Sequence, residues 1–344
     1  MPRQPTMTDI ARRAGVSRVA VSYALNGRPG VSDVMRDRIL HIAREIGFDA
    51  NGAARAMHGA AAPAIGMTMR RASSTAYSVE VFRREFVSGV QGELMARNTG
   101  LALQFVSGAA EEMDVYRRWH AERRVGGVLV CDLEPDDPRV PGLHDLGLPA
   151  VVVGGPAPGG LLGSVGSDDA TAVAEAVAHL AGLGHRRITR VSGPAALLHS
   201  RVRDEAFRTA CRAAGAVPVV VGADYSGDAG AQATRRLLSS ADRPTAVAYD
   251  NDVMAVAGLA VAREMGVAVP GELSIVAFED SPLCQAVRPA LTVLRRDIVA
   301  YGARAARQLF EAMDGAEPRA VLDHTARLTV RASTGPVPGP AAGG

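Results

Sequence analysis

The 344-residue sequence is poor in cysteine and contains no lysine. Its three cysteines, Cys131, Cys211 and Cys284, are odd in number and far apart, which excludes a disulfide framework and the common zinc-ligand spacings. We therefore expect buried, reduced thiols, no metal site and no cofactor. All 38 cationic residues are arginines, which we attribute to compositional bias rather than to function.

Long apolar runs are also missing. No stretch approaches the ~18–20 unbroken apolar residues that a membrane span requires. The N-terminus runs from Met1-Pro2-Arg3 into a helical pattern without the apolar core of a secretory signal. We therefore expect a cytoplasmic protein with no membrane partner. With 47% apolar and 22% charged residues, the chain is expected to be globular, with two or three domains.

The small net charge of +2 is unevenly distributed. Residues 1–60 contain nine arginines and five acidic residues, so the rest of the chain is mildly acidic. A basic head on an acidic body is typical of a module that binds a polyanion such as nucleic acid.

The segment from Thr8 to Asn26, TDIARRAGVSRVAVSYALN, predicts two short helices joined by a glycine turn. Thr8 is a candidate cap for the first helix, and Ser17 is a candidate cap for the second. Two helices joined by so short a turn are typical of a helix-turn-helix. An ordinary surface hairpin has the same pattern, so the motif alone does not establish DNA binding.

The outward positions of the second helix suit a DNA groove. They combine a cation, hydroxyls, an amide and small apolar groups, which match a groove floor and its phosphate rims. These positions are Arg18, Val19, Ser22, Tyr23 and Asn26.

Two further segments complete the head. A third helix is predicted over 32–45, with Val34 in its apolar stripe. Residues 51–59 predict about two turns of helix, and 60–63 a linker. An isolated helix shorter than ~12–15 residues is unstable in water, so we expect the segment 51–59 to order only when something packs on it.

From Ile65 onward, strand-length apolar runs alternate with helical patterns. A first series predicts strands over 65–69, 101–106, 127–131 and 150–153, with helices over 82–98 and 111–123. A second series predicts strands over 164–167, 187–192, 218–221, 245–248 and 273–278, with helices over 169–183, 201–214, 227–239 and 252–266. A strand over 291–294, a helix over 297–313 and a strand over 326–331 follow.

Alternating strands and helices predict parallel sheets covered on both faces, and these strands are too many for one small sheet. The expected fold class is therefore an all-α helix-turn-helix head followed by an α/β core of two parallel-sheet subdomains. The tail, residues 335–344, is rich in Pro, Gly and Ala and is expected to be disordered.

The motifs, taken in order, resemble the LacI/GalR family of transcriptional regulators. In the head and hinge the matching residues are Asp9-Ile10-Ala11, Ala14-Gly15-Val16-Ser17, Val21-Ser22, Leu25-Asn26, Arg28-Pro29-Gly30-Val31-Ser32, Gly47-Phe48 and Asn51 with Ala54-Arg55-Ala56. In the body they include Ser167-Asp168-Asp169, Gly184-His185-Arg186-Arg187-Ile188, Ser192-Gly193-Pro194, Arg201 and Arg203, Asp250-Asn251-Asp252, Phe278-Glu279-Asp280, Pro289-Ala290-Leu291-Thr292 and Val330-Arg331.

The resemblance implies a domain organisation. Residues 1–50 would form the DNA-binding domain, 51–63 the hinge helix and linker, and 64–334 a core like periplasmic sugar-binding proteins. The N-subdomain would comprise about 64–163 and 292–323, and the C-subdomain about 164–289 and 324–334, because the family's chain crosses between subdomains three times.

The resemblance also implies roles in DNA binding. Arg18, Val19 and Tyr23 occupy the positions that select the base sequence in the major groove. Thr8, Ser17, Ser22, Asn26 and Asn51 match positions that contact the DNA backbone. In the hinge, Ala54 and Met57 match the residues at the minor groove, where Met57 would be wedged between base pairs.

The family places a small effector in the cleft between the two subdomains. The corresponding residues here are Phe82, Arg203, Tyr225, Asn251 and Glu279. Asp168 and Asp169 suit helix N-termini better than a ligand site, and Asp280 suits a cap. Gly126 and Gly154 stand where acids are common in the family, so we expect few acids on the first-subdomain wall.

The sequence thus predicts a DNA-binding regulator that is controlled by a sugar or related metabolite. We expect a repressor, because repression is the commoner outcome in the family. We expect it to bind a pseudo-palindromic double-stranded operator at the nucleoid as a homodimer, possibly a tetramer. The alternatives are a solute receptor of periplasmic-binding-protein type and an enzyme. The basic head disfavours the receptor, and the lack of a P-loop, nucleophile elbow, zinc spacing or triad disfavours the enzyme.

Overall fold

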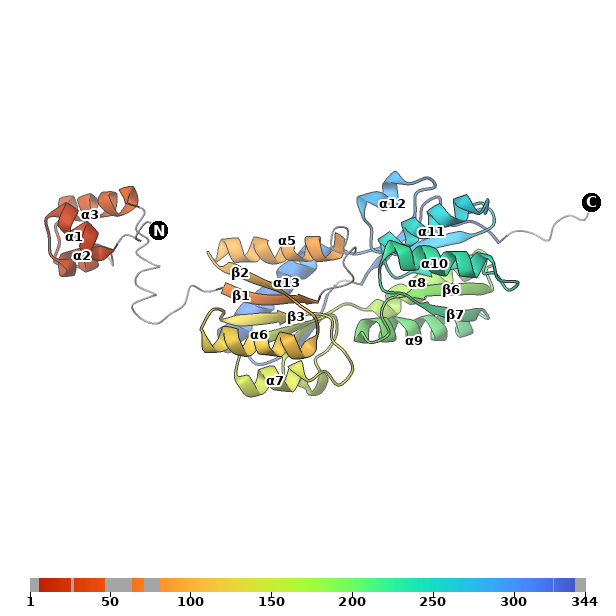
Figure 1. The fold of residues 1–344 in the computed structure, drawn as a ribbon, viewed down its shortest axis with the longest axis horizontal. Coiled ribbons are helices and arrows are strands. Elements are labelled where there is room, and N and C mark those ends of the chain that lie inside the picture. The colour runs from red at the N-terminus through yellow and green to blue at the C-terminus, as the bar shows by residue number, and fades with distance from the viewer. Residues whose placement is uncertain (1–5, 26–27, 47–63, 71–80, 324, 338–344) are drawn as a thin grey trace, which may run out of the picture.

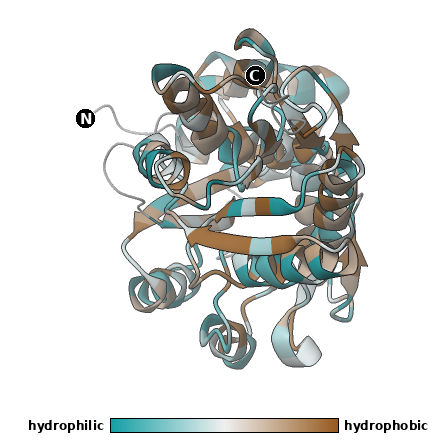
Figure 2. Cartoon of the chain, turned by 90° about the vertical axis from the view of Figure 1, so that its right-hand side faces the viewer, coloured by the Kyte–Doolittle hydropathy of each residue, from teal (hydrophilic) through white to brown (hydrophobic). Residues whose placement is uncertain are grey.

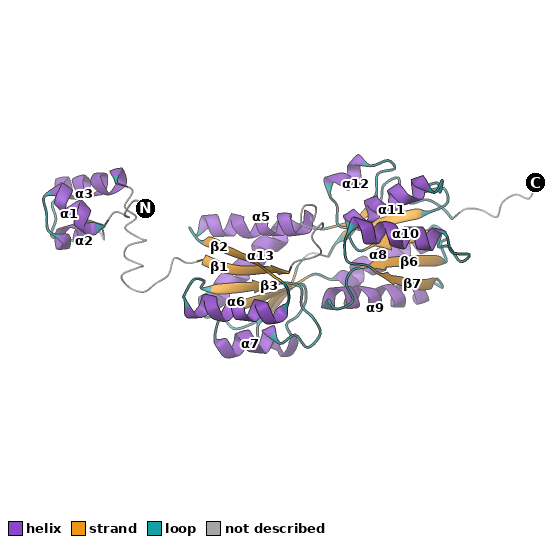
Figure 3. Ribbon diagram, in the orientation of Figure 1, coloured by secondary structure: helices purple, strands orange, loops and turns teal. Residues whose placement is uncertain are grey.

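The computed structural model describes residues 6–25, 28–46, 64–70, 81–323 and 325–337. These residues form a three-helix head and a core of two lobes, each built on a six-stranded sheet (Figures 1 and 3). The first lobe contains β1 and the second lobe contains β6. The observed architecture confirms the predicted fold class.

The head consists of α1 (Met7–Ala14), α2 (Arg18–Leu25) and α3 (Asp33–Glu45). Its core includes Ile10, Val21 and Ile39, all fully buried. Thr6, rather than Thr8, precedes α1, and its N–H and hydroxyl donate to Asp9 Oδ2 at 2.9 and 2.6 Å. The prediction that Val34 belongs to the apolar stripe is wrong, because its side chain is 83% exposed.

The first lobe has an all-parallel sheet in the order β11-β5-β4-β3-β1-β2. Its strands are β1 (Ala64–Arg70), β2 (Gly100–Val106), β3 (Gly127–Val130), β4 (Ala150–Val153), β5 (Gly163–Gly166) and β11 (Ala320–Leu322). Its helices are α5 (Val81–Ala96), α6 (Ala109–Ala121), α7 (Arg139–Leu146) and α13 (Ile298–Met313), together with the 3₁₀ turn η2 (Pro158–Gly160). Helices α5 and α13 pack on one face, and α6 and α7 on the other.

The second lobe has the order β12-β10-β9-β8-β6-β7, in which only β12 is antiparallel to its neighbour. Its strands are β6 (Arg187–Ser192), β7 (Val217–Gly222), β8 (Ala246–Tyr249), β9 (Ser274–Phe278), β10 (Thr292–Arg295) and β12 (Arg327–Thr329). Its helices are α8 (Asp169–Gly182), α9 (Leu198–Ala213), α10 (Gly227–Leu238), α11 (Asp252–Glu264) and α12 (Pro282–Ala286). Apolar residues are frequent along the strands, and hydrophilic residues are frequent on the surrounding helices (Figure 2).

Strand pairing shifts the expected subdomain boundaries by a few residues. β5 pairs with β4, so 163–166 belongs to the first lobe and not to the second series. β10 pairs with β9, so 292–295 belongs to the second lobe. The chain therefore crosses between lobes after β5, after β10 and between β11 and β12. The short apolar runs could not show which sheet each would join, because pairing is a tertiary choice.

Several further details differ from the sequence predictions. Helices α7 and α12 and strand β11 were not predicted, because they are short and weakly periodic. Trp119 on α6 is 1% exposed and fills the space above Gly66. The tail is ordered at its start, since Gly335 O lies 3.0 Å from His185 Nε2 and Val337 N donates to Leu183 O at 2.9 Å.

None of the helices in the described part of the chain is long and apolar enough to span a membrane.

Helices α5 and α13 cross closely because glycines line the contact. A Cβ atom at Gly89 would lie 1.9 Å from Val299 O, and one at Gly302 would lie 2.2 Å from Phe86 O. The two backbones therefore touch where any larger residue would separate them. This contact holds α13, which belongs to the second chain segment of the first lobe, against α5.

Gly89→Ala should lower the melting temperature of the core by roughly 3–10 °C, because the added methyl forces the two backbones apart at ~1–3 kcal/mol. Gly92→Ala is the matched control on the same helix, since its Cβ would meet nothing within 4 Å. It should leave stability unchanged or raise it by up to ~1 kcal/mol. Equal melting temperatures for the two variants would contradict the close crossing. Thermal unfolding followed by circular dichroism measures both.

Candidate functional site

The second helix of the head, α2, has one solvent-exposed side, which carries both polar and apolar side chains. Val21 and Ala24 point into the head core, which leaves Arg18, Val19 (60% exposed) and Tyr23 (37% exposed) outside. All three predicted base-reading residues therefore share one accessible face. Val19 and Tyr23 are four positions apart and so lie on the same side of the helix, and Arg18 immediately precedes Val19 at the exposed start of α2.

Local turns set the position of α2. Gly15 adopts φ +71°, which permits the tight turn after α1. Ser17 Oγ then accepts a hydrogen bond from Ala20 N at 3.2 Å and caps α2, as predicted. At the far end, Gly30 at φ +114° lies against Tyr23, where an added Cβ would be 3.2 Å from the ring.

The predicted backbone-contacting residues are only partly described. Thr8 and Ser17 are exposed, and Ser22 is half-buried on the same helix as Arg18. Asn26, Asn51, Ala54 and Met57 lie outside the described residues.

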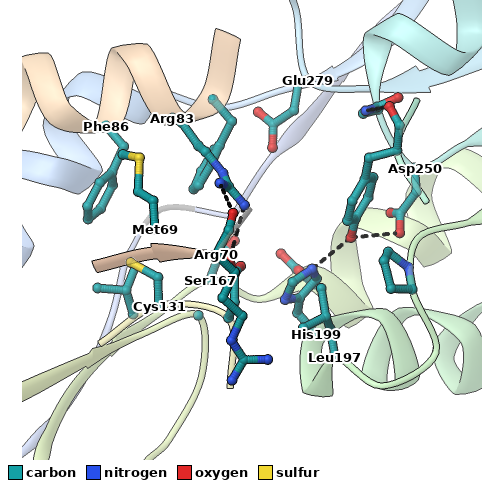
Figure 4. A pocket seen from close by; sticks show the side chains of 18 of the residues that line it. Met69, Arg70, Arg83, Phe86, Cys131, Ser167, Leu197, His199, Asp250 and Glu279 are labelled. Carbon is teal, nitrogen blue, oxygen red and sulfur yellow. Dashed lines mark hydrogen bonds and ion pairs between the residues drawn. The ribbon is translucent and has the colours of Figure 1, made fainter. Parts of the chain in front are cut away.

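A cavity of about 340 Å³ lies between the two lobes (Figure 4). The residues from β1, α5, β4 and α13 of the first lobe are mostly apolar: Met67, Met69, Phe82, Phe86, Val153 and Tyr301. Those from the second lobe are mostly polar: Asp169, His199, Arg203, Tyr225, Asp250, Asn251, Asp252 and Glu279. All five residues predicted to hold the effector line this one cavity. Its volume is within the usual range of small-molecule sites.

Arg203 is the centre of a buried ion-pair network. Its Nε donates to Asp169 Oδ2 at 2.5 Å and its Nη1 to Asp250 Oδ1 at 2.9 Å. The guanidinium also lies 3.9 Å from the centre of the Phe278 ring. Arg190 Nη2 donates to the same Asp250 Oδ1 at 2.6 Å. Arg203 is therefore held rigidly by carboxylates on two sides.

Two arginines control the ionisation of Asp250. Burial by itself raises the pKa of this carboxyl, but Arg190, Arg203 and the Gly193 N–H lower it more, so the net shift is downward. The pKa of Asp169 is lowered by Arg203 and Arg296 against the same burial effect. Both groups are therefore ionised at neutral pH and balance buried guanidiniums.

Glu279 follows β9 at φ +76°, a backbone conformation that is unusual for a residue with a side chain. Its Oε1 accepts from Arg296 Nη2 at 2.6 Å. Arg296 lies at the crossover after β10 and packs on Phe82, 4.9 Å from the ring centre. Glu279 and Phe82, predicted from opposite subdomains, are thus joined through an arginine that the sequence did not single out.

Tyr225, also at positive φ (+68°), lies stacked on His199 with its hydroxyl 2.7 Å from His199 Nε2. Burial and the neighbouring Arg203 lower the pKa of His199, so the ring is neutral at physiological pH. Asn251 caps α11, with Oδ1 accepting from Met254 N at 2.8 Å and Nδ2 donating to Tyr225 O at 2.9 Å. Asn251 therefore shapes the cavity through the backbone as well as facing it.

The structure corrects several expectations about acidic residues. Asp168 caps α8 as predicted, by accepting from Thr171 N at 3.0 Å, but Asp169 is a cavity residue and not only a helix-terminal one. Asp280, expected to be a cap, instead binds both Nη atoms of Arg331 at 2.8 and 2.6 Å. Sequence position after a parallel strand was the signal that could have identified Asp169 and Asp250 as cavity residues.

The first-lobe wall is also more acidic than predicted. Gly126 does not line the cavity, because it lies against Met313 under α13. Asp132 and Glu134, from the loop after β3, line it instead and pair with Arg83 and Arg70. The family position at Gly126 was therefore a poor guide to the charge of this wall.

The lobes touch directly beside the cavity. Leu198 N, at the start of α9, donates to Leu133 O in the first-lobe loop at 2.7 Å. Leu198 also packs on the apolar cluster beneath α6 and α7. A ligand that changes the distance between the lobes must act on this contact and on Arg296.

Within the described residues, neither the cysteines nor any cluster of metal-ligating side chains forms another functional site. Cys211 and Cys284 are buried, Cys131 is half-buried, and all three are free thiols. Burial raises the pKa of Cys131 and Cys211, which makes both thiols unreactive at neutral pH. No group of three or more His, Cys, Asp or Glu is placed to hold a metal ion in that part of the chain.

Comparisons with known proteins match both parts of the chain. The model of bacterial regulatory proteins, lacI family, matches residues 6–51, and that of the periplasmic binding protein-like domain matches 177–334. The HTH-type transcriptional regulator CelR of Thermobifida fusca is 30% identical over 342 residues, covering 96% of this chain and 98% of CelR.

Two solved structures show the same architecture. The CelR–cellobiose complex has 28% identity and a TM-score of 0.72, covering 96% of this chain and 99% of its own. The lac repressor dimer bound to operator and the anti-inducer ONPF has a TM-score of 0.84, covering 97% and 100%. At 21% identity, the latter likeness concerns the fold alone.

A helix-turn-helix head on a two-lobed core with a cavity between the lobes defines a DNA-binding transcriptional regulator of the ligand-responsive class. The chain belongs to the LacI family of bacterial transcriptional regulators. The predicted resemblance is thereby confirmed, and a regulator is favoured over a solute receptor without DNA function. The relatives found are transcriptional regulators rather than enzymes.

Asp250→Asn should lower the unfolding free energy at pH 7 by ~3–5 kcal/mol, because it leaves two buried guanidiniums without full compensation. The folded state holds this carboxyl below its unfolded pKa of ~3.9, so its stabilisation is complete above that pH and is lost as the pH falls further. The difference between wild type and variant should therefore shrink below about pH 4.

Asp242→Asn is the matched control, because Asp242 is 84% exposed in its pair with Arg187. It should change stability by at most ~0.5 kcal/mol. Denaturant unfolding at pH 7 and pH 3.5 provides the measurement. If Asp250→Asn lowers the free energy of unfolding by the same amount at both pH values, the assigned ion pairs are contradicted.

Proposed function

We propose that this regulator reads its operator through the exposed face of α2. Arg18, Val19 and Tyr23 would contact base edges in the major groove, since they are accessible on one side of a helix that the head core holds in place. Arg18 suits guanine O6 and N7. Thr8, Ser17 and Ser22, with Asn26 and Asn51, would contact the DNA backbone and add affinity without sequence preference.

The operator would be a pseudo-palindrome bound by a homodimer, because two heads related by a twofold axis meet two inverted half-sites. The segment 51–59, with Ala54 and Met57, would order at the minor groove between the half-sites. Repression is the proposed outcome.

The observation that carries the allosteric part is the cavity shared by both lobes. Arg296 and the Leu198–Leu133 contact connect the lobes beside it, so a ligand there binds open and closed arrangements with different affinity. Such a differential affinity is what shifts an equilibrium between two states. We propose a sugar or related metabolite as effector, with Phe82, Arg203, Tyr225, Asn251 and Glu279 around it.

The relative CelR was solved with cellobiose, which makes that disaccharide the first probe. The polar second-lobe wall suits hydroxyl groups, and the apolar first-lobe wall suits the carbon face of a sugar ring. Substitution of Arg203 is by itself a poor test of this site. Its removal would leave Asp169 and Asp250 without their partner and would destabilise the fold as well.

Arg18→Ala should weaken binding to a selected operator by ~1–3 kcal/mol and relax the preference at one base pair. Arg38→Ala, an exposed arginine on α3, is the control and should leave the sequence preference unchanged. The operator is first obtained by selection from random duplexes, and affinity is measured by fluorescence anisotropy at several salt concentrations. Wild-type protein that shows neither sequence preference nor loss of affinity with salt would refute the proposed DNA reading.

Phe82→Ala should weaken the binding of an effector sugar about tenfold while leaving operator affinity in its absence unchanged. The reason is that Phe82 lies on the cavity wall and supports Arg296 but is remote in sequence from the head. Leu283→Ala, an exposed apolar residue of α12, is the control. Thermal shifts with cellobiose and other sugars, followed by anisotropy with any sugar that binds, test this. Sugar binding that leaves operator affinity unchanged would contradict the coupling.

A further inference from the structure

Charged residues around the cavity are unbalanced. Among the described residues, seven carboxylates line it against four guanidiniums. The carboxylates belong to Asp132, Glu134, Asp169, Asp224, Asp250, Asp252 and Glu279, and the guanidiniums to Arg70, Arg83, Arg203 and Arg296. The only lining histidine, His199, is neutral at physiological pH. The cavity therefore has an excess of negative charge.

The two arginines of the first-lobe wall are already paired. Arg70 forms an ion pair with Glu134 and lies 3.6 Å from Glu112 through Nε. Arg83 pairs with Asp132 at 3.2 Å and donates to Arg70 O at the same distance. An anionic ligand would therefore meet two guanidiniums whose positive charge is already balanced by a carboxylate.

The remaining two arginines are engaged in the same way. Arg203 is shared between Asp169 and Asp250, and Arg296 binds Glu279 at 2.6 Å. Breaking one of these buried pairs leaves a carboxylate without compensation, which is strongly unfavourable. The four described arginines of the cavity thus neutralise protein acids, and their remaining N–H groups carry no uncompensated charge to attract a phosphate or carboxylate.

Several buried carboxylate oxygens have no hydrogen-bond donor within the described residues. They are Oε2 of Glu279, Oδ2 of Asp252 and Oδ1 of Asp169, on side chains that are 7, 3 and 7% exposed. Asp169 Oδ1 has Arg296 only at 3.9 Å. Buried acceptors without donors are costly, so a ligand that donates hydrogen bonds to them is favoured.

Several buried donors around the cavity are also without acceptors among the described residues. Arg70 Nη2 and Arg296 Nε lack one, and Ser167 Oγ makes no hydrogen bond among the described residues. Each of these arginines is already charge-neutralised, so a neutral oxygen satisfies the remaining N–H. A hydroxyl group, which both donates and accepts, matches the two sets together.

The negative potential extends beyond the cavity wall. The pKa of Glu85, on α5, is raised by burial and by the carboxylates of Glu279, Asp297 and Asp252, against a lowering effect from Arg84. Three carboxylates therefore act on Glu85. This supports the charge balance read from the lining residues.

We propose that the effector of this cavity is a neutral or amine-bearing polyhydroxyl compound, and that phosphorylated and carboxylated sugars are rejected. The inference rests on the proposed function and specifies its ligand class. Hydroxyl or ammonium groups of the ligand would donate hydrogen bonds to Glu279 and Asp252. Its hydroxyl oxygens would accept hydrogen bonds from Arg70 and Arg296. A ligand phosphate would instead face seven carboxylates and four guanidiniums among the described lining residues, and each of those guanidiniums is already paired with an acid.

The test uses matched sugar sets on the full-length protein. Glucose, galactose, mannose, cellobiose and maltose are compared with available 2-amino, 6-phosphate and uronic acid derivatives, and inorganic phosphate is included. Thermal shift identifies binders, and isothermal titration calorimetry measures their dissociation constants. For every parent sugar that binds, its phosphate or uronic acid derivative should have a dissociation constant at least about tenfold higher than that of the neutral sugar. Inorganic phosphate alone should produce no shift.

Two variants locate the effect. Glu279→Gln and Asp252→Asn keep size and remove one charge each, and should reduce the advantage of an amino sugar over its neutral parent about fivefold. Glu264→Gln, an exposed acid at the other end of α11, is the matched control and should change neither affinity. Unfolding of each variant without ligand checks that the lobe is intact.

The outcomes separate this inference from the proposed function. A phosphorylated or acidic sugar that binds more tightly than its neutral parent, and changes operator affinity, overturns the charge inference and leaves the regulator model intact. A panel in which no sugar binds contradicts the proposed effector class, and the charge inference falls with it. Equal effects of Glu264→Gln and Glu279→Gln would refute the assignment of the site.

Discussion

The carboxylate of Asp250 is the point on which the cavity depends. It lies directly after β8 and accepts from Arg190, Arg203 and the Gly193 N–H. Those partners belong to β6, α9 and the loop after β6, so one buried charge holds the ends of several elements in place. Because a buried ion must be compensated, these contacts are rigid, and the cavity wall is formed before any ligand enters.

This rigidity determines which groups are free to recognise a ligand. Arginines that would ordinarily attract an anion are used to neutralise Asp250, Asp169 and Glu279, whereas carboxylate oxygens beyond those pairs remain unsatisfied. The first lobe offers apolar side chains beside two paired arginines and the second a mostly polar surface, so a ligand contacting both links them. Structural stability and ligand selectivity therefore arise from the same set of ion pairs.

Sequence patterns predicted most of the architecture. The alternation of apolar runs and helical patterns predicted two parallel-sheet lobes, and the spacing around Gly15 predicted a helix-turn-helix with Arg18, Val19 and Tyr23 outside. The sequence did not show which sheet each strand joins. Strands β5 and β10 were assigned to the wrong lobes, because a four-residue apolar run carries no information about its partner strand. Short elements such as α12 were missed for lack of periodicity.

The sequence by itself determined most of the elements and the exposed face of α2, because these follow from local periodicity, and its resemblance to the family identified five residues that line the cavity. Only the tertiary structure decided how charges are paired. Arg296 meets Glu279 and Phe82, and Asp169 meets Arg203, across separations of 17 to 214 residues and between two lobes. Such partners are selected by three-dimensional proximity in a low-dielectric interior, a property that no local pattern encodes.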